Sequence, residues 1–269
     1  MGGKVCEVDK VNAVVLAGAS NDGPMSEISG EPYEALIPIA DRPMICYVLD
    51  ALRQVPCIER IVVVGPRELQ PLLGRTIELV PSTDSLVDNI QAGLAHLVSP
   101  QPVLLITSDI PLITGEAIED FLTRCRQVEA HIYYPIVSKE INELHYPGVQ
   151  RTYVTLKDGT FTGGNMVLLQ PELLTQCQEV ISRAIGMRKK PVQLSRMLGL
   201  RFIIRYLLKR LEMAEIEDRA GEILGFAGKG IVSPYPEVGI DVDKPSDYEL
   251  VQECLHRLNA DDGLQSNPT

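Results

Sequence analysis

The chain has 269 residues, a net charge of -11 and an isoelectric point near 4.9. This acidic balance argues against a nucleic-acid-binding surface, which needs Lys and Arg in excess on one face. No stretch reaches the ~18 uninterrupted apolar residues that a membrane span requires, and the opening MGGKVCEVDK lacks the apolar centre of a signal peptide. We therefore expect a cytoplasmic protein, and its 45% of apolar residues is enough for a sizeable core.

The first half of the sequence alternates apolar strands with amphipathic helices. Short apolar runs predict a turn or strand at 35–39 and buried strands at 13–17, 61–65, 77–80 and 103–107. Helices are predicted from Pro43, after Ser82 or Asp84 with Leu86, Ile90, Leu94 and Leu97 on one face, and from Thr114 or Gly115 to about Val128. This alternation predicts a mostly parallel sheet, with ligands bound beyond the carboxyl ends of its strands.

The pattern changes after residue 130. Strand-like segments follow at 132–137, 152–156 and 161–169, with the turn signal Asp158-Gly159 between the last two. The remainder predicts helices over 171–228, most clearly 198–211, then a loop and strand at 232–242, a last helix from Ser246 to about Leu258, and a disordered tail over 260–269. The second half is therefore expected to be richer in antiparallel strands.

The loop after the first strand has features of a phosphate site. Gly18 and Gly23 let backbone N–H groups come close to an anion. Their spacing is that of a P-loop, but Pro24 and Met25 stand where Lys and Ser or Thr would follow, and Ser20 breaks a G-x-G-x-x-G reading. The loop therefore predicts a nucleotide site that follows neither motif.

These residues resemble the opening of the MobA-like nucleotidyltransferases. L-A-G-A-S-N-D-G-P-M, followed by E-A-L-I-P-I-A-D-R-P-M-I, is similar to the family patterns L-A-G-G-x-G-x-R-M and P-K-x-L-x-x-x-x-G-x-P-M-I. The Arg and Lys of the family fall on Pro24 and Glu34, so two cations expected to hold a triphosphate are absent. The resemblance implies an α/β, three-layer Rossmann-like nucleotide-diphospho-sugar transferase fold, with a mostly parallel mixed sheet and helices on both faces.

A chain of 269 residues can form one large α/β domain or two small ones, and we expect one domain with an insertion. We expect one domain over 1–259, with its nucleotide-binding half at 11–130 and its acceptor-binding half at 131–250. The helices predicted at about 171–228 would be an insertion in the second half.

Aspartates at two places in the chain are implied ligands of Mg²⁺. Asp109 follows the strand at 103–107 in the string S-D-I-P, whose D-x-P Asp binds the metal in similar families. Alternation along the predicted strand places Asp241 and Asp243 on one face, in a segment similar to the D-x-D-T-P-x-D of the family. The resemblance implies catalytic roles for Asp109 and Asp241. Simple capping of turns or helices by these aspartates is the alternative.

The same resemblance implies two substrate sites. The expected nucleotide-binding residues are Leu16, Ala17, Gly18, Ala19, Asn21, Gly23, Ser82, Ser85 and Asn89. Asn can both donate and accept at a base edge, although capping explains Ser82 equally well. The expected acceptor-binding residues are Arg151, Gly163, Gly164 and Asn165, of which the paired glycines could instead form a structural bulge.

Basic residues elsewhere could neutralise phosphate or form a surface. Arg151, Lys157 and the run at 188–190 are the candidates, and the run is equally typical of a solvated helix end. The basic amphipathic helix at 198–211 is expected to pack on its own domain or on the twin subunit of a homodimer, with an anionic membrane surface as the less favoured alternative.

The sequence therefore predicts a Mg²⁺-dependent nucleotidyltransferase. Its partners would be a nucleoside triphosphate and a small-molecule acceptor with a phosphate or hydroxyl nucleophile, and it would release pyrophosphate. Pro24 and Glu34 support an alternative, a nucleotide-binding sensor or scaffold that keeps the fold with impaired catalysis.

Overall fold

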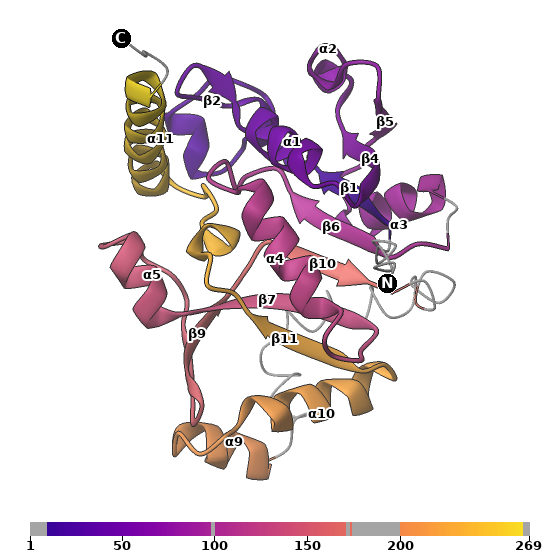
Figure 1. Cartoon of the computed structure of the whole chain (residues 1–269), viewed down its shortest axis with the longest axis vertical. Coiled ribbons are helices and arrows are strands. Elements are labelled where there is room, and N and C mark those ends of the chain that lie inside the picture. The colour runs from indigo at the N-terminus through magenta and orange to yellow at the C-terminus, as the bar shows by residue number, and fades with distance from the viewer. Residues whose placement is uncertain (1–9, 98–99, 171–172, 174–199, 266–269) are drawn as a thin grey trace, which may run out of the picture.

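The computed structural model describes residues 10–97, 100–170, 173 and 200–265 (Figure 1). In this part of the chain, nine strands form one mixed sheet in the order β5-β4-β1-β6-β10-β7-β9-β8, with β11 paired to β7. The four strands that the first half contributes to this sheet, β1, β4, β5 and β6, are parallel to one another, whereas β10 pairs with β6 in an antiparallel sense. The predicted α/β fold with a mostly parallel mixed sheet is confirmed.

The first half contains the elements that the apolar runs predict. Its strands are β1 (Val11–Leu16), β2 (Pro38–Ile39), β3 (Arg42–Pro43), β4 (Ile58–Gly65), β5 (Ile77–Pro81) and β6 (Val103–Thr107). Its helices are α1 (Met44–Gln54), α2 (Gln70–Leu73), α3 (Leu86–Leu97) and α4 (Gly115–Cys125), with short 3-10 turns η1 (Pro24–Glu27), η2 (Glu34–Leu36) and η3 (Arg67–Leu69).

Helices cover both faces of the sheet. Ala13 and Val15 of β1 lie in one apolar cluster with residues of α1 and α4, whereas Val14 lies in a second cluster with Ile90 and Leu94 of α3. Alternation along a strand produces this division, because successive side chains point to opposite faces. Figure 1 shows α1 and α4 on the near side of β1 and β6.

The second half adds antiparallel strands and further helices. It contains β7 (Ile132–Ser138), α5 (Lys139–His145), β8 (Val154–Leu156), β9 (Gly159–Gly163), β10 (Met166–Leu169), α9 (Leu200–Leu207), α10 (Met213–Leu224), β11 (Gly228–Val232), η4 (Pro236–Gly239) and α11 (Pro245–Gln265). Helix α5 was not predicted. A third apolar cluster packs α11 against η1 and β2, so the last helix covers the N-terminal loop.

The single strand predicted at 161–169 is wrong, because the chain breaks between β9 and β10. Gly164 N–H donates to Pro135 O at 2.9 Å, and Asn165 N–H donates to Val238 O at 2.8 Å. These bonds turn the chain from one edge of β7 to the other, so that β9 and β10 flank the same strand. The paired glycines permit this turn because they have no side chain. A Cβ atom at either position would meet neighbouring backbone or side-chain atoms.

Several boundaries also differ from the prediction. Helix α4 ends at Cys125 rather than near Val128, and Leu86 is 45% exposed although it was expected on the buried face of its helix. Helix α11 continues to Gln265, so residues 260–265 are helical rather than disordered. Apolar periodicity gave no signal for this extension, since its residues are mostly polar.

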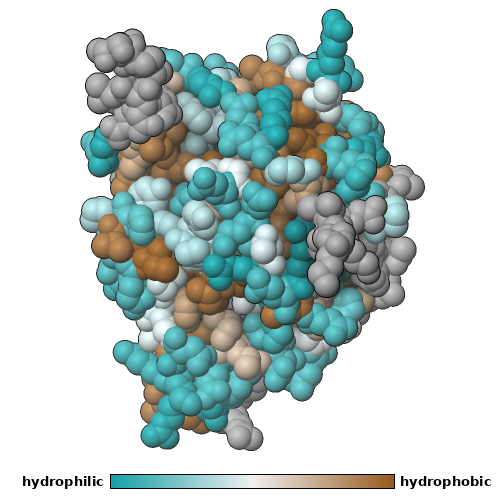
Figure 2. Space-filling model, in the orientation of Figure 1, coloured by the Kyte–Doolittle hydropathy of each residue, from teal (hydrophilic) through white to brown (hydrophobic). Residues whose placement is uncertain are grey.

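The basic helix predicted at 198–211 is shorter than expected. Helix α9 ends at Leu207, and Leu207 and Leu208 are 72% and 59% exposed. Packing of α9 on a twin subunit stays a prediction, and the basic run at 188–190 lies outside the described residues. On the face in Figure 2, hydrophilic residues surround separate hydrophobic patches. In the residues that the structure covers, no helix has the length and apolar character to cross a membrane.

Candidate active site

Loops at the carboxyl ends of the parallel strands meet at one edge of the sheet. Ala17 N–H donates to Val64 O at 2.8 Å, and Ser108 N–H donates to Leu16 O at 3.2 Å. Ser82 N–H likewise donates to Gly65 O at 3.1 Å. The loops after β1, β5 and β6 are therefore held side by side, where an open parallel sheet binds its ligands.

Gly18 lies against the loop after β5. A Cβ atom at position 18 would stand 2.6 Å from Ser82 Cβ and 3.0 Å from Asn89 Nδ2. Real carbon atoms do not approach so closely, so a side chain here would force the two loops apart. The structure thus brings together three of the residues predicted to bind nucleotide.

The side chain of Asn89 is occupied by the neighbouring loop. Its Oδ1 accepts from Thr83 N–H at 2.7 Å, and its Nδ2 donates to Thr83 O at 2.9 Å. Ser85 Oγ accepts from Asp88 N–H at 3.3 Å, as a helix cap does. Asn89 therefore shapes the loop over 82–85, and the contact of Ser82, Ser85 and Asn89 with a base stays a prediction.

Asn21 closes the long loop after β1. Its Nδ2 donates to Ser29 O and to Glu31 O, both at 2.9 Å, while Ala19 O accepts from Glu34 N–H at 3.1 Å. A Cβ atom at Gly23 would meet nothing within 4 Å, so space is open beside that residue. Asn21 holds the loop in shape, and Gly23 leaves room for a ligand to approach its backbone.

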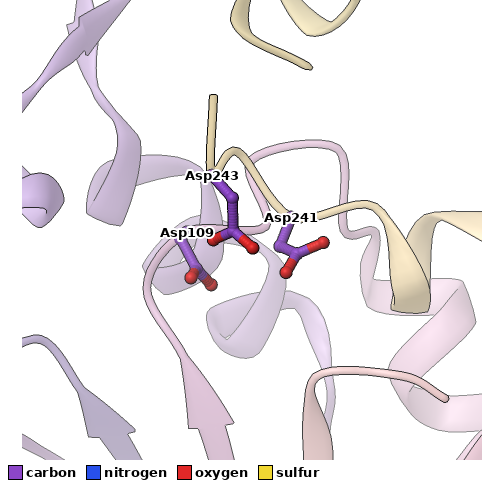
Figure 3. A group of neighbouring side chains, drawn as sticks. All are labelled: Asp109, Asp241 and Asp243. Carbon is purple, nitrogen blue, oxygen red and sulfur yellow. The ribbon is translucent and has the colours of Figure 1, made fainter. Parts of the chain in front are cut away.

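The three predicted metal ligands come together although their strand was predicted wrongly. Residues 241–244 belong to no strand, yet Ile240 and Val242 are buried in the cluster under α11, and Asp241 and Asp243 point the other way. Val242 N–H donates to Asp109 O at 2.9 Å and fixes the two segments together. One carboxylate oxygen from each of Asp109, Asp241 and Asp243 lies within 4.8 Å of the others (Figure 3).

Charge repulsion and desolvation act strongly in this cluster. Burial raises the pKa of Asp109, and the charge of Asp241 raises it further. Desolvation and the charges of Asp241 and Asp109 raise the pKa of Asp243 to about 7. Burial and the charges of Asp109 and Asp22 also raise the pKa of Glu34, so a carboxylate faces the cluster where the family pattern carries Lys. The site attracts cations.

Arg151 is paired within this cluster. Its Nη1 forms an ion pair with Asp241 Oδ1, and its Nη2 donates to Asp241 O at 2.8 Å. The Arg151 side chain is only 10% exposed. Its placement as an acceptor-binding residue stays a prediction, because this guanidinium is engaged by a candidate metal ligand.

A cavity of about 610 Å³ opens beside the aspartates. Among the predicted site residues, its lining includes Leu16, Arg151, Gly163, Gly164, Asn165, Asp241 and Asp243. The glycines are also packed by protein, since a Cβ atom at Gly163 would lie 2.1 Å from Tyr134 Oη and one at Gly164 would lie 2.9 Å from Val238 O. Asn165 was predicted to bind the acceptor substrate. Its side chain forms no hydrogen bond with another residue in the described part of the chain.

Other residues of the lining were not predicted. They include Leu86, Thr107, Tyr134, Gln150, Thr152, Thr162, Lys244 and Asp247. Lys244 had a signal in the sequence, because it follows Asp243 directly where the family pattern has Thr. Gln150 and Thr152 flank Arg151, so their positions follow from the loop that carries that arginine.

The donor set fits a divalent cation. Asp109 Oδ1 is buried and has no hydrogen-bond partner among the described residues, although burial of an unpaired carboxylate oxygen is costly. Carboxylate oxygens are the ligands that Mg²⁺ prefers. Asp109, Asp241 and Asp243 would hold such an ion at the edge of the cavity.

Comparison with known proteins agrees with this class of fold. A solved structure described as a hypothetical transferase from Thermus thermophilus is 38% identical, with a TM-score of 0.80 over 89% of this chain and 99% of that one. A CMP:2-keto-3-deoxy-manno-octonic acid synthetase complexed with CTP shares the fold at 15% identity, with a TM-score of 0.57 over 92% and 99% of the two chains. The fold is that of the nucleotide-diphospho-sugar transferases.

The sequence profile of the MobA-like NTP transferase domain matches residues 13–197. The chain therefore belongs to the MobA-like NTP transferase family, as the resemblance of its opening predicted. The bifunctional protein GlmU of Exiguobacterium sibiricum is 26% identical over 125 residues, 45% of this chain. The match covers 27% of the length of that curated relative.

Proposed function

We propose that the protein is a Mg²⁺-dependent nucleotidyltransferase, which transfers NMP from an NTP to a phosphorylated or hydroxyl acceptor. The observation that carries this proposal is the convergence of Asp109, Asp241 and Asp243 at the edge of a cavity of about 610 Å³. An NTP and a small acceptor need such a shared space, because the attacking and leaving oxygens must lie on opposite sides of the α-phosphorus.

The chain would act mainly by positioning and by charge. When bound, Mg²⁺ would supply positive charge that neutralises the phosphate oxygens. The three aspartates would hold it, and the backbone near Gly23 would approach the phosphates. An acceptor oxygen would then form a bond to the α-phosphorus while the bond to the bridging oxygen of pyrophosphate breaks. No general base is needed where the acceptor nucleophile is an ionised phosphate.

The acceptor would occupy the part of the cavity near β9 and β10. Asn165 offers both a donor and an acceptor there, and Thr162, Gln150 and Thr152 add further neutral polar groups. These groups suit an acceptor with several hydroxyl oxygens in addition to its nucleophile. The CTP complex of the synthetase with this fold supports a triphosphate as the other substrate.

A second function is supported by the charges at two positions. Pro24 supplies no cation, and Glu34 faces the aspartates with a carboxylate. A nucleotide-binding sensor or scaffold of the same fold would tolerate this deficit, because binding requires less charge neutralisation than phosphoryl transfer.

Pyrophosphate release separates these two functions. The four common NTPs should be incubated with Mg²⁺ and a panel of sugar phosphates, polyol phosphates and unphosphorylated sugars. We expect pyrophosphate release with one combination of NTP and acceptor. EDTA and the variant Asp109→Asn should abolish it. The control Asp218→Asn, at an exposed position of α10, should retain it. Thermal stabilisation by an NTP without release in any combination would support the sensor instead.

A further inference from the structure

Lys244 presents a cation at the wall of the cavity. It follows Asp243 directly and precedes the first residue of α11. Its side chain forms no hydrogen bond or ion pair with any residue that the structure describes. Among the described residues of the lining, the other cation is Arg151, which is bound to Asp241. Lys244 is therefore the cation of this wall that remains available to a ligand.

Helix stability does not account for Lys244. The N-terminus of a helix carries partial positive charge, so a cation immediately before α11 is electrostatically unfavourable. Asp247, in the first turn of α11, supplies the favourable charge, and its Oδ2 accepts from Asp243 N–H at 3.4 Å. Burial raises the pKa of Asp247 and the charges of Arg151 and Lys244 oppose that shift, so Lys244 interacts favourably with Asp247 but not with the helix dipole.

Helix α11 packs on η1, in the loop where Pro24 stands in place of the Arg of the family pattern. Met25 of η1 shares an apolar cluster with Val242 and with Val251 of α11. Lys244 lies between Val242 and Val251 in the chain, and Met25 follows Pro24, where the family pattern has Arg. Glu34, where the pattern has Lys, also interacts electrostatically with Asp243, the residue that precedes Lys244.

We infer that Lys244 binds the polyphosphate of the nucleoside triphosphate and replaces charge that the family pattern places at positions 24 and 34. An ammonium group suits this task, because its three donors rotate freely and it acts on phosphate as a point charge. The inference rests on the proposed function in one respect: it requires that a polyphosphate binds at this cavity.

Calorimetric titration with inorganic tripolyphosphate and Mg²⁺ tests the inference without an acceptor or a base. The variants are Lys244→Met, Lys244→Arg and the control Lys10→Met, whose lysine pairs with Glu59 at the opposite end of β1. We expect Lys244→Met to weaken binding by about tenfold, the loss of one charge-assisted contact. Lys244→Arg should stay within about threefold of the wild type, since its charge is kept. Lys10→Met should bind as the wild type does.

A second measurement separates phosphate binding from metal binding. Mn²⁺ affinity, measured by electron paramagnetic resonance without polyphosphate, should not fall in Lys244→Met, because removal of a neighbouring cation does not weaken the attraction of aspartates for a metal. A fall in Mn²⁺ affinity equal to the loss of tripolyphosphate affinity would overturn the inference, since Lys244 would then act through the metal site.

The outcomes also distinguish this inference from the function on which it rests. If the wild type and Lys244→Met bind tripolyphosphate equally, the role of Lys244 is refuted while the proposed transferase stands. If the wild type binds neither tripolyphosphate nor any NTP in the presence of Mg²⁺, both the role of Lys244 and the proposed transferase function are refuted. Weaker tripolyphosphate binding in Lys244→Met, with rescue by Arg and unchanged Mn²⁺ affinity, supports the inference.

Discussion

Arg151 holds Asp241 at two points, with Nη1 paired to Oδ1 and Nη2 donating to the backbone oxygen at 2.8 Å. The two residues are ninety positions apart in the chain. This contact restrains the carboxylate that lies between Arg151 and the other two aspartates, and it offsets part of their repulsion. Arg151 therefore connects the loop before β8 to the segment before α11 that carries two of the candidate metal ligands.

Replacement of Arg151 by Met should destabilise the protein in the absence of metal. Asp241 would face Asp109 and Asp243 without its counterion, and we expect a loss of about 2 kcal/mol, less than for a fully buried pair. Mg²⁺ should then raise the melting temperature of Arg151→Met more than that of the wild type. Thermal unfolding with EDTA and with Mg²⁺ measures both, with the exposed Arg67→Met as control. Equal melting temperatures of Arg151→Met and wild type in EDTA would refute the restraint.

Gly18 and Gly23 should respond differently to the same substitution. Gly18→Ala places Cβ 2.6 Å from Ser82 Cβ, so we expect a loss of about 1–3 kcal/mol from overpacking. Gly23→Ala meets open space and should change stability by no more than about 0.5 kcal/mol. Urea unfolding measures both free energies. Addition of Ser82→Gly to Gly18→Ala should recover part of the loss; no recovery would show that the contact with Ser82 is not its cause.

Removal of the Asn89 amide should destabilise the loop over 82–85. Asn89→Ala leaves Thr83 N–H and Thr83 O without their partners, and we expect a loss of about 2 kcal/mol because two part-buried hydrogen bonds of the buried Asn89 side chain are removed. Asp88→Ala, on the exposed face of the same helix, is the matched control. Chemical denaturation measures the free energy of unfolding of the wild type and of both variants. If both variants lose the same amount, the cause is the helix in general and not this loop.

Glu237 should make stability depend on pH. Burial raises the pKa of Glu237 in the folded protein above its usual value of 4.5, so folding there favours the protonated form. The destabilising effect of the charge is therefore absent at pH 4 and grows as pH rises through the folded pKa. Glu237→Gln, which keeps an oxygen for the 3.3 Å bond from Thr114 Oγ1, should gain about 1 kcal/mol at pH 8 and little at pH 4.

Thermal unfolding at both pH values measures this difference. Glu119→Gln, at an exposed position of α4, serves as the control and should gain nothing at either pH. A gain by Glu237→Gln that is equal at pH 4 and pH 8 would contradict an origin in the charge of the carboxylate.

The features that the sequence predicted correctly depend on local patterns. Uninterrupted apolar runs identify β1 and β6, because strands buried on both faces tolerate few polar groups. The alternation of Ile240 and Val242 with aspartates predicted that Asp241 and Asp243 share a side, and this holds although the segment is not a strand. In an extended chain, burial of every second residue is enough to place the residues between them, Asp241 and Asp243, on the opposite side.

The features that the sequence did not predict depend on distant contacts. The break between β9 and β10 follows from Tyr134 and Pro135, which pack on Gly163 and Gly164 from another strand. The pairing of Arg151 with Asp241 joins two segments with no shared periodicity. No local sequence pattern predicts which distant residue an isolated arginine or asparagine side chain will contact.

The bond from Val242 N–H to Asp109 O has a consequence for the synthesis of the protein. A growing chain that has reached residue 200 already contains the strands around β1 and β6, yet it carries one of the three carboxylates. The family profile also ends, at residue 197, before the other two. The candidate ion site can therefore be completed only after Asp243 has left the ribosome, so nascent or shortened forms that end before Asp241 would lack two of its three carboxylates.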